Sequence, residues 1–219
     1  MMIFLAMLAA VPIAIIQGSF FEWAFHRYWL HRPWLPEACF RSHTMIHHQL
    51  CKYEDTFHVE SEEQHEALTF AWWGGPTLVA LNIAPWVLAA WGLTAAGITV
   101  PYLAFLITFA VTVALYYVGY EGLHYLMHKP TFPFIEHSGF FKFIKRHHAI
   151  HHVYMDKNLN VLLPIADFFL GSLVLVPPRA MPTRTGEGAR ITARKFSRYG
   201  QRIEHETDSE HQETASNSR

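Results

Sequence analysis

The sequence predicts an all-α integral membrane protein, a helical bundle with about three to four transmembrane helices and a cytoplasmic cap. Of the 219 residues, 51% are hydrophobic and only 16% are charged, which is typical of a single membrane-embedded domain. Three apolar segments, 2–25, 68–92 and 100–123, reach the length of about 20 residues that crosses a bilayer. All 17 Lys and Arg lie outside these segments, in 27–52 or 129–219.

The apolar segments differ in what is expected of them. The first carries no Lys or Arg before Arg27, whereas a signal peptide begins with a basic region, so we expect a retained helix. The second is expected to be kinked by glycine and proline, at Gly74, Gly75, Pro76 and Pro85. A fourth apolar stretch, 161–178, is interrupted by Pro164 and Asp167. It is expected either to lie at the interface or to dip into the bilayer and return.

The charges predict the topology. Three crossings place 26–67 and 124–219 on one face of the membrane and leave 93–99 on the other. Because Lys and Arg are confined to the first face, the positive-inside rule makes that face cytoplasmic. We therefore predict a multi-pass protein whose C-terminus, and every histidine of the sequence, lie at or beyond the cytoplasmic face.

The chain is expected to form a membrane domain over 1–178 and a polar tail over 179–219. The tail is partly disordered or forms a short helix on anionic lipid, with apolar residues at helical spacing, Phe196, Tyr199 and Ile203. The net charge of −1 predicts no nucleic-acid partner. Cys39 and Cys51 are too few for a disulfide framework or a four-cysteine metal site, so we expect free thiols on a reducing side.

Sixteen histidines set the sequence apart, and "KRHHAIHH" holds four of them within six residues. Ten of them form four boxes that adjoin or follow apolar segments. Histidines four apart on a helix share one face, and adjacent histidines diverge by about 100°, so they can serve two neighbouring metals. We expect all ten to bind metal: His26 and His31; His43, His47 and His48; His124 and His128; His148, His151 and His152.

Two acids precede the boxes. Glu22 and Glu121 lie at the mouths of apolar helices, where an isolated charge is costly. We expect each to accept the second ring N–H of a metal-bound histidine; the alternative is a hydrated acid at a helix end. The pattern of an acid followed by two boxes occurs over 22–48 and again over 121–152, which suits a two-metal site shared between the halves.

The other six histidines are expected to be ordinary core or surface residues, not ligands, with His58 and His65 on a solvated or interfacial face and His205 and His211 in the polar tail. His147 competes with its neighbour His148, and the spacing of the last box favours His148. The six are His58, His65, His137, His147, His205 and His211.

The four boxes resemble those of the fatty acid hydroxylase / sterol desaturase superfamily of integral membrane di-iron enzymes. The resemblance covers about residues 20–172, and the pattern HX3-4H, HX2-3HH, HX3H and HX2HH is matched without a missing box. It includes the closing "NLNVLLPIADFFLGS", in which Asn160 and Asp167 are candidates for orienting ligands or protons. Carotenoid hydroxylases of the same superfamily are similar around "FHRYWLH" and "FKFIKRHHAIHH", but their third box usually has four intervening residues.

The resemblance implies a di-iron hydroxylase domain over 1–178, with two iron ions and O2 as co-substrate. Imidazole alone does not select iron over zinc or copper, so the iron assignment rests on the resemblance. It implies hydroxylation of a lipid C–H bond, with no catalytic residue beyond the metal centre. Desaturation on the same scaffold remains an alternative, as does a non-enzymatic membrane protein that binds or transports metal.

The substrate is expected to be a fatty acyl, sterol or carotenoid lipid that enters from the bilayer. Aromatic residues can line its path or form an interfacial belt; they are Trp23, Phe25, Tyr28, Trp29, Trp72, Trp73, Tyr116, Tyr117 and Tyr120. The sequence has no glycine-rich dinucleotide motif and no electron-transfer module. We therefore expect a separate ferredoxin-, cytochrome- or reductase-type electron donor.

Overall fold

The computed structural model describes residues 1–33, 36–59, 68–177, 179, 181, 195–196 and 202–203. Within these residues, regular structure is helical apart from one pair of two-residue strands. The elements are α1 (Met2–Phe25), η1 (His26–Leu30), α2 (Glu37–Phe40), η2 (Arg41–His47), α3 (His48–Leu50), η3 (Glu54–Thr56), α5 (Gly74–Ala95), α6 (Tyr102–His128), α7 (Pro133–Glu136), α8 (Gly139–Val153), α9 (Ile165–Phe169), β1 (Lys195–Phe196) and β2 (Arg202–Ile203).

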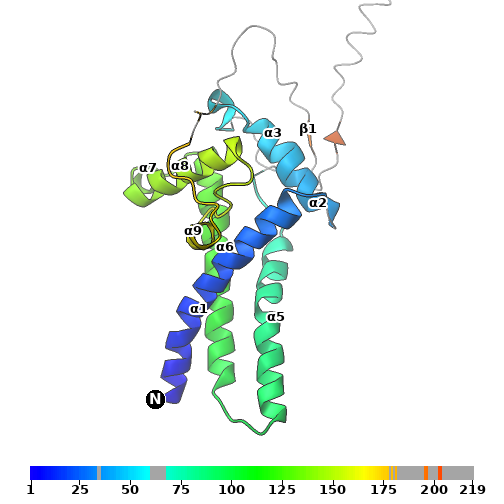
Figure 1. The fold of residues 1–219 in the computed structure, drawn as a ribbon, viewed down its shortest axis with the longest axis vertical. Helices are drawn as coiled ribbons and strands as arrows, with labels where there is room; N and C mark the ends of the chain where they lie inside the picture. The colour runs from blue at the N-terminus through cyan, green and yellow to red at the C-terminus, as the bar shows by residue number, and fades with distance from the viewer. Residues whose placement is uncertain are drawn as a thin grey trace, which may run out of the picture.

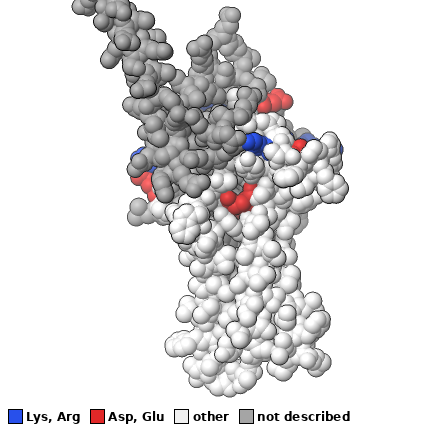
Figure 2. Space-filling model, turned by 180° about the vertical axis from the view of Figure 1, so that it is seen from behind, with Lys and Arg blue, Asp and Glu red and all other residues white. Residues whose placement is uncertain are grey.

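Three helices are long and apolar enough to cross a membrane: Met2–Leu30, Gly74–Ala95 and Tyr102–His128. They form the long body of the molecule, and the N-terminus and the α5–α6 connection lie at one end of it (Figure 1). The short helices gather at the opposite end. Charged residues are confined to that end on the face drawn in Figure 2, and the surface of the long helices shows none. The prediction of three apolar spans is confirmed.

The boundaries of the second and third spans differ from prediction. The second helix begins at Gly74 instead of residue 68. Gly74, Gly75 and Pro76 form its first turn, where proline is well tolerated. They therefore do not kink the middle of the helix. Pro85 alone lies inside it. The third helix continues to His128, so it carries the third histidine box as part of the span.

Small residues and one polar cluster hold the long helices together. Ala10 and Ala14 of α1 pack against Phe109 and Val113 of α6. The Gln17 side chain donates to the main-chain oxygen of Asn82 at 2.8 Å and accepts from the Trp86 indole at 2.8 Å. Such interhelical hydrogen bonds are favoured where lipid offers no alternative partner.

The apolar stretch 161–178 does not form a fourth span. In its described part, 161–177, only α9 is helical, and it is five residues long. It is fastened to α1 by Ser19, whose hydroxyl donates to the Leu163 oxygen at 2.9 Å and accepts from the Ala166 N–H at 3.1 Å. Phe168 and Phe169 remain exposed, as expected of a segment that lies along an interface.

The tail is described at only a few positions. Lys195–Phe196 pairs in antiparallel fashion with Arg202–Ile203, so the predicted helix through Phe196 and Ile203 is wrong at these residues. The rest of that prediction, with Tyr199, His205 and His211, lies outside the described residues, as does His65. Cys39 and Cys51 are free thiols, as predicted.

Candidate metal centre

The structure brings all ten predicted ligands together. Nine form two groups in which the ligand atoms lie within 4.8 Å of one another. The first group is His26, His31, His43, His48 and His151; the second group is His47, His128, His148 and His152. His124 borders the second group, with its Nε2 atom 3.3 Å from that of His47. Every one of these histidines except His31 is buried.

The first group is built on π-helical turns. His26 and His31 are five residues apart, and the His31 N–H donates to the His26 oxygen at 3.2 Å. In η2 the His48 N–H likewise bonds the oxygen of His43. A π-helical turn aligns residues i and i+5, so each pair lies on one face. The expected α-helical pairing of His43 with His47 is therefore replaced by His43 with His48. Such turns often occur at functional sites.

Three of the four members of the second group, His128, His148 and His152, lie on regular α-helices, and His47 ends the π-helical element η2. His148 and His152 are four residues apart on α8, and their Nε2 atoms lie 3.0 Å apart. His124 and His128 have the same spacing on α6. Adjacent histidines enter different groups: His47 and His152 join the second, while their neighbours His48 and His151 join the first. This is the division predicted from the 100° offset between neighbouring helical residues.

The spacing of the ligand atoms suits a metal ion in each group. Two imidazole nitrogens bound to one ion at about 2.1 Å can be at most about 4.2 Å apart. The observed limit of 4.8 Å requires only small movements to reach that value. The two groups also adjoin, since the rings of His48 and His152 have centroids 4.4 Å apart. The arrangement can therefore hold two ions side by side.

Main-chain carbonyls orient the ligands of each group. In the first group, the Nδ1 atoms of His26 and His151 lie 2.5 and 2.8 Å from the oxygens of Leu159 and Lys157. At the second group, Nδ1 of His128 lies 2.7 Å from the Phe57 oxygen. A carbonyl only accepts, so each Nδ1 carries the proton. Each Nε2 is then left with a free lone pair directed at the cluster.

Thr44 orients His31 in the same way. Its hydroxyl donates to the Leu30 oxygen at 2.6 Å, which uses its one proton. The contact of 3.1 Å between Thr44 Oγ1 and His31 Nδ1 must then be donated by the ring. The Nε2 lone pairs of His31 and His151 consequently face each other at 3.0 Å. Two lone pairs at this distance repel unless a cation lies between them.

Burial keeps these rings neutral. It lowers the pKa of His31 to about 2 and that of His151 to about 4. It also holds the pKa values of the other ligands outside the spans well below their usual range, with further lowering by neighbouring histidines; these are His43, His47, His48, His148 and His152. A proton is therefore a poor candidate for a cation that would bind these lone pairs. Neutral imidazole is the form that binds metal.

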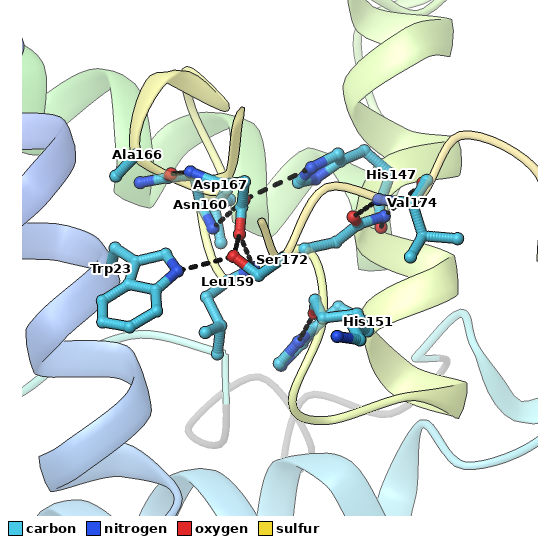
Figure 3. Close-up of polar contacts among 12 residues, drawn as sticks. Trp23, His147, His151, Leu159, Asn160, Ala166, Asp167, Ser172 and Val174 are labelled. Carbon is cyan, nitrogen blue, oxygen red and sulfur yellow. Dashed lines mark hydrogen bonds and ion pairs between the residues drawn. The ribbon is translucent and has the colours of Figure 1, made fainter. Parts of the chain in front are cut away.

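The loop after α8 is fixed by Asp167 (Figure 3). The Asp167 carboxylate accepts from the N–H groups of Leu159 and Asn160 at 2.9 and 2.8 Å and from the Ser172 hydroxyl at 2.6 Å. The ring of His147 lies 3.4 Å away. Burial raises the pKa of Asp167, but the contacts from His147, Ser172 and Asn160 outweigh burial and lower it. The carboxylate thus supports the loop whose carbonyls orient His26 and His151.

Asn160 links this loop to the first helix. Its side-chain oxygen accepts from the Asp167 N–H at 3.0 Å, and its amide donates to the Ser19 oxygen at 2.8 Å. The predicted orienting role of Asn160 and Asp167 therefore takes an indirect form, through main-chain groups, in this structure. Neither side chain has a hydrogen bond to one of the ten ligands among the described residues.

The prediction for the two glutamates is wrong. Glu22 and Glu121 were expected to accept the ring N–H groups of nearby ligands. Those ring nitrogens bond main-chain carbonyls instead. Glu22 accepts from the Tyr116 hydroxyl at 2.6 Å and from the Val161 N–H, so it joins the loop to α1 and α6. Glu121 accepts from the Phe70 N–H at 3.3 Å.

The histidines expected outside the site remain outside it where the structure describes them. His137 is exposed, and His58 lies at the surface with its ring 2.8 Å from the Lys145 amine. His147 is buried beside Asp167 and belongs to neither ligand group. The preference for His148 as the ligand agrees with the geometry.

The site also uses residues that the sequence did not single out. The oriented carbonyls belong to Phe57, Leu68, Lys157 and Leu159, and a carbonyl has no sequence signature. Thr44 had a signal that was not used, since it lies inside the second histidine box. The fold and site define the chain as a helical protein with three membrane-length helices and two buried histidine groups that can hold metal ions. Comparison with protein-family models, with curated proteins and with solved structures finds no match.

Proposed function

We propose that this chain is a membrane-bound, O2-dependent di-iron oxygenase that hydroxylates a C–H bond of a lipid, within the fatty acid hydroxylase / sterol desaturase superfamily. The facing lone pairs of His31 and His151, 3.0 Å apart in a buried site, carry the proposal. Their protons point away, to Thr44 and to the Lys157 oxygen. Without a cation to bind them, these two lone pairs repel each other.

Two ions are favoured over one because the ligands divide. Neighbouring histidines in two boxes enter different groups, and each group alone supplies at least four nitrogens. In the described residues neither group contains a carboxylate. Sites with only imidazole ligands suit iron, zinc or copper, and the resemblance of the four boxes favours iron. When bound, a pair of iron ions supplies the oxygen activation needed to convert C–H to C–OH.

The chain's own residues hold and isolate this centre. Carbonyls fix the tautomers of four histidines, so the ligand atoms are oriented before any metal arrives, as outer partners commonly do in metal sites. Phe57 covers one side of the second group, with its ring 4.4 Å from that of His128. Burial of the ligands excludes bulk water, which limits unproductive reactions at the centre.

The location and partners follow from the same proposal. The cap would face the cytoplasm, because the Lys and Arg residues lie at its end of the bundle. Electrons would come from a separate ferredoxin-, cytochrome- or reductase-type donor. The lipid would come from the bilayer that surrounds the three long helices. Hydroxylation is preferred to desaturation on the resemblance of the boxes.

The test is incorporation of isotopically labelled O2 into membrane lipids by cells that express the full chain. The active-site variant is His151→Ala with His152→Ala, which removes one ligand from each group. The matched control is His137→Ala, an exposed histidine outside the site. Labelled hydroxyl groups should appear with the parent and the control and be absent with the double variant. Equal labelling in cells that express each of the three proteins would overturn the proposal. So would an absence of labelling from all three when the purified proteins are also given a range of lipid extracts and electron donors.

A further inference from the structure

A large apolar cavity lies beside the first helix. Its volume is about 580 Å³, within the range of about 300–1,000 Å³ that is usual for small-molecule sites. It is bordered by α1, η1, the region of α2 and η2, residues 69–73 and the start of α5. Its apolar walls include Phe21, Phe25, Trp29, Trp73, Leu78 and Leu81.

The lining is uncharged. Among the described residues that border the cavity, the polar side-chain groups are three hydroxyls, one thiol and two indole N–H groups, those of Ser42, Thr69, Thr77, Cys39, Trp29 and Trp73. Transfer of a carboxylate or an amine into such a space without a partner is strongly unfavourable. An occupant must therefore be uncharged, or must leave its charged group outside.

A narrow space lies between this cavity and the histidines. It is bordered by Ser42, Thr69 and Phe70, which also border the large cavity, and it ends at His43 and His124. His43 belongs to the first group and His124 borders the second. The space has a volume of about 20 Å³, room for about one water molecule. It thus ends at one ligand of the first group and at the histidine that borders the second, and it is closed to a larger molecule.

Phe70 stands at the junction. It borders the large cavity, the narrow space and a third cavity of about 50 Å³ that touches Glu22 and His26. Its ring stacks on Tyr120 with centroids 6.0 Å apart and meets the ring of Phe25 edge-on at 6.2 Å. Its main chain is held by Glu121. The side chain can therefore turn while the backbone stays in place.

We propose that the large cavity binds a single flexible apolar chain, of alkyl or acyl type, and that Phe70 is the gate between this chain and the histidine groups. The role of Phe70 in admitting a substrate rests on the proposed function. The binding of an apolar chain in the cavity does not. A thin chain end needs only the Phe70 ring to turn aside. A fused-ring lipid would require the passage to widen on several sides at once. The charged end of an acyl lipid would remain outside.

Three of the aromatic residues predicted to line a lipid path, Phe25, Trp29 and Trp73, border the large cavity. Tyr116, Tyr117 and Tyr120 border the smaller one beside it. Trp23, Tyr28 and Trp72 border neither cavity; Trp72 is exposed.

The binding test is photochemical cross-linking of the full chain in detergent or vesicles. The probe is a long-chain primary alcohol with a diazirine near its terminal carbon, and labelled peptides are mapped by mass spectrometry. Ala24→Phe places a ring in the cavity wall, and Ala80→Phe makes the same change at an exposed position outside the lining. Labelling of the cavity peptides should fall roughly tenfold in Ala24→Phe, equivalent to about 1.4 kcal/mol, and be retained in Ala80→Phe. Equal labelling in both variants would overturn the binding site.

The gate is tested with Phe70→Ala. The chain-end probe should label the peptides that carry His43 and His124 several times more than in the parent, while labelling near Phe25 is retained and so reports an intact cavity. An unchanged pattern would overturn the gate. An excess of unlabelled straight-chain alcohol should compete, and a sterol should not; equal competition would overturn the preference for a flexible chain.

These readouts need neither iron nor turnover. The same labelling in metal-free protein and in the variant His151→Ala with His152→Ala would uphold the cavity even if the proposed oxygenase activity failed. Loss of cavity labelling in a protein that still hydroxylates lipid would instead overturn the cavity alone.

Discussion

His26 Nδ1 lies 2.5 Å from the carbonyl oxygen of Leu159, a residue 133 positions later in the chain. The Leu159 N–H in turn donates to the carboxylate of Asp167 at 2.9 Å. A ligand on the first helix is thus oriented by a loop near the end of the membrane domain. The carbonyls of Phe57 and Leu68, which bond His128 and His124, come from a different segment. Each side of the centre therefore has its own support.

Asp167→Asn should weaken the first metal site selectively. The new amide would place a donor against the donors that now bond the carboxylate, so the loop would shift and His26 and His151 would lose their orientation. Loss of such an outer partner typically lowers metal affinity about 10–100-fold. At a metal concentration that is just enough to fill both sites of the parent, elemental analysis should show about one ion per chain in Asp167→Asn and two in the parent. Asp156→Asn, at an exposed aspartate, should retain both; equal loss in the two variants would refute the role of Asp167.

Thr44→Val should have a similar effect through His31. Valine keeps the size of the side chain but cannot accept the ring N–H, so the His31 tautomer is no longer fixed. We expect metal affinity to fall about tenfold or more, measured by competition with a chelator. Thr44→Ser retains the hydroxyl and should restore binding. If serine and valine behave alike, the hydroxyl does not position His31.

The metal-free protein should lose stability in acid. An unfolded histidine has a pKa of about 6.5, whereas burial lowers the pKa of His151 to about 4 and that of His31 to about 2. The unfolded chain therefore binds more protons below pH 6.5, and stability falls as the pH drops. The loss attributable to His151 is spread between about pH 6.5 and 4, and that of His31 continues to about pH 2.

Thermal unfolding in detergent measures this effect. The midpoint should fall between pH 7 and pH 5 in the metal-free parent, and by less in His151→Asn, which removes one of the groups that titrate. A midpoint that is constant over this range, or that rises in acid, would contradict neutral burial of the cluster.

The close approach of α5 and α6 depends on Gly75. A Cβ atom at this position would lie 2.5 Å from the Tyr117 ring, whereas one at Gly92 would meet nothing within 4 Å. Gly75→Ala should therefore lower the free energy of unfolding by about 1–3 kcal/mol, the usual cost of overpacking. Gly92→Ala, on the same helix, should be neutral or slightly stabilising. Denaturant unfolding in detergent compares the two, and equal stabilities would refute the tight contact.

Much of the helical body could be predicted from the sequence because each span is marked by an apolar run and an absence of charge. The first helix ends at Phe25, where polar residues begin. The start of the second could not be predicted from hydropathy alone, since residues 68–73 are as apolar as the helix that follows. Its start is set by the glycines and the proline at 74–76.

The ligands could be predicted because histidine is rarely clustered without a function, and the boxes repeat at helical spacing. The π-helical turns could not be predicted, because i,i+5 pairing in Arg41–His47 depends on how the cap packs. The expected glutamate partners were wrong for a similar reason. Main-chain carbonyls bond the ring nitrogens in place of the glutamates. The positions of these carbonyls are set by tertiary structure.

Metal content of the purified full chain tests the central claim most directly. The protein is expressed with ample iron, and iron is measured in the parent, in His137→Ala and in His151→Ala with His152→Ala. Because each group can hold one ion, we predict two irons per chain in the first two proteins and loss of iron in the double variant. Binding of no metal, or equal binding in all three proteins, would contradict the assignment of the site.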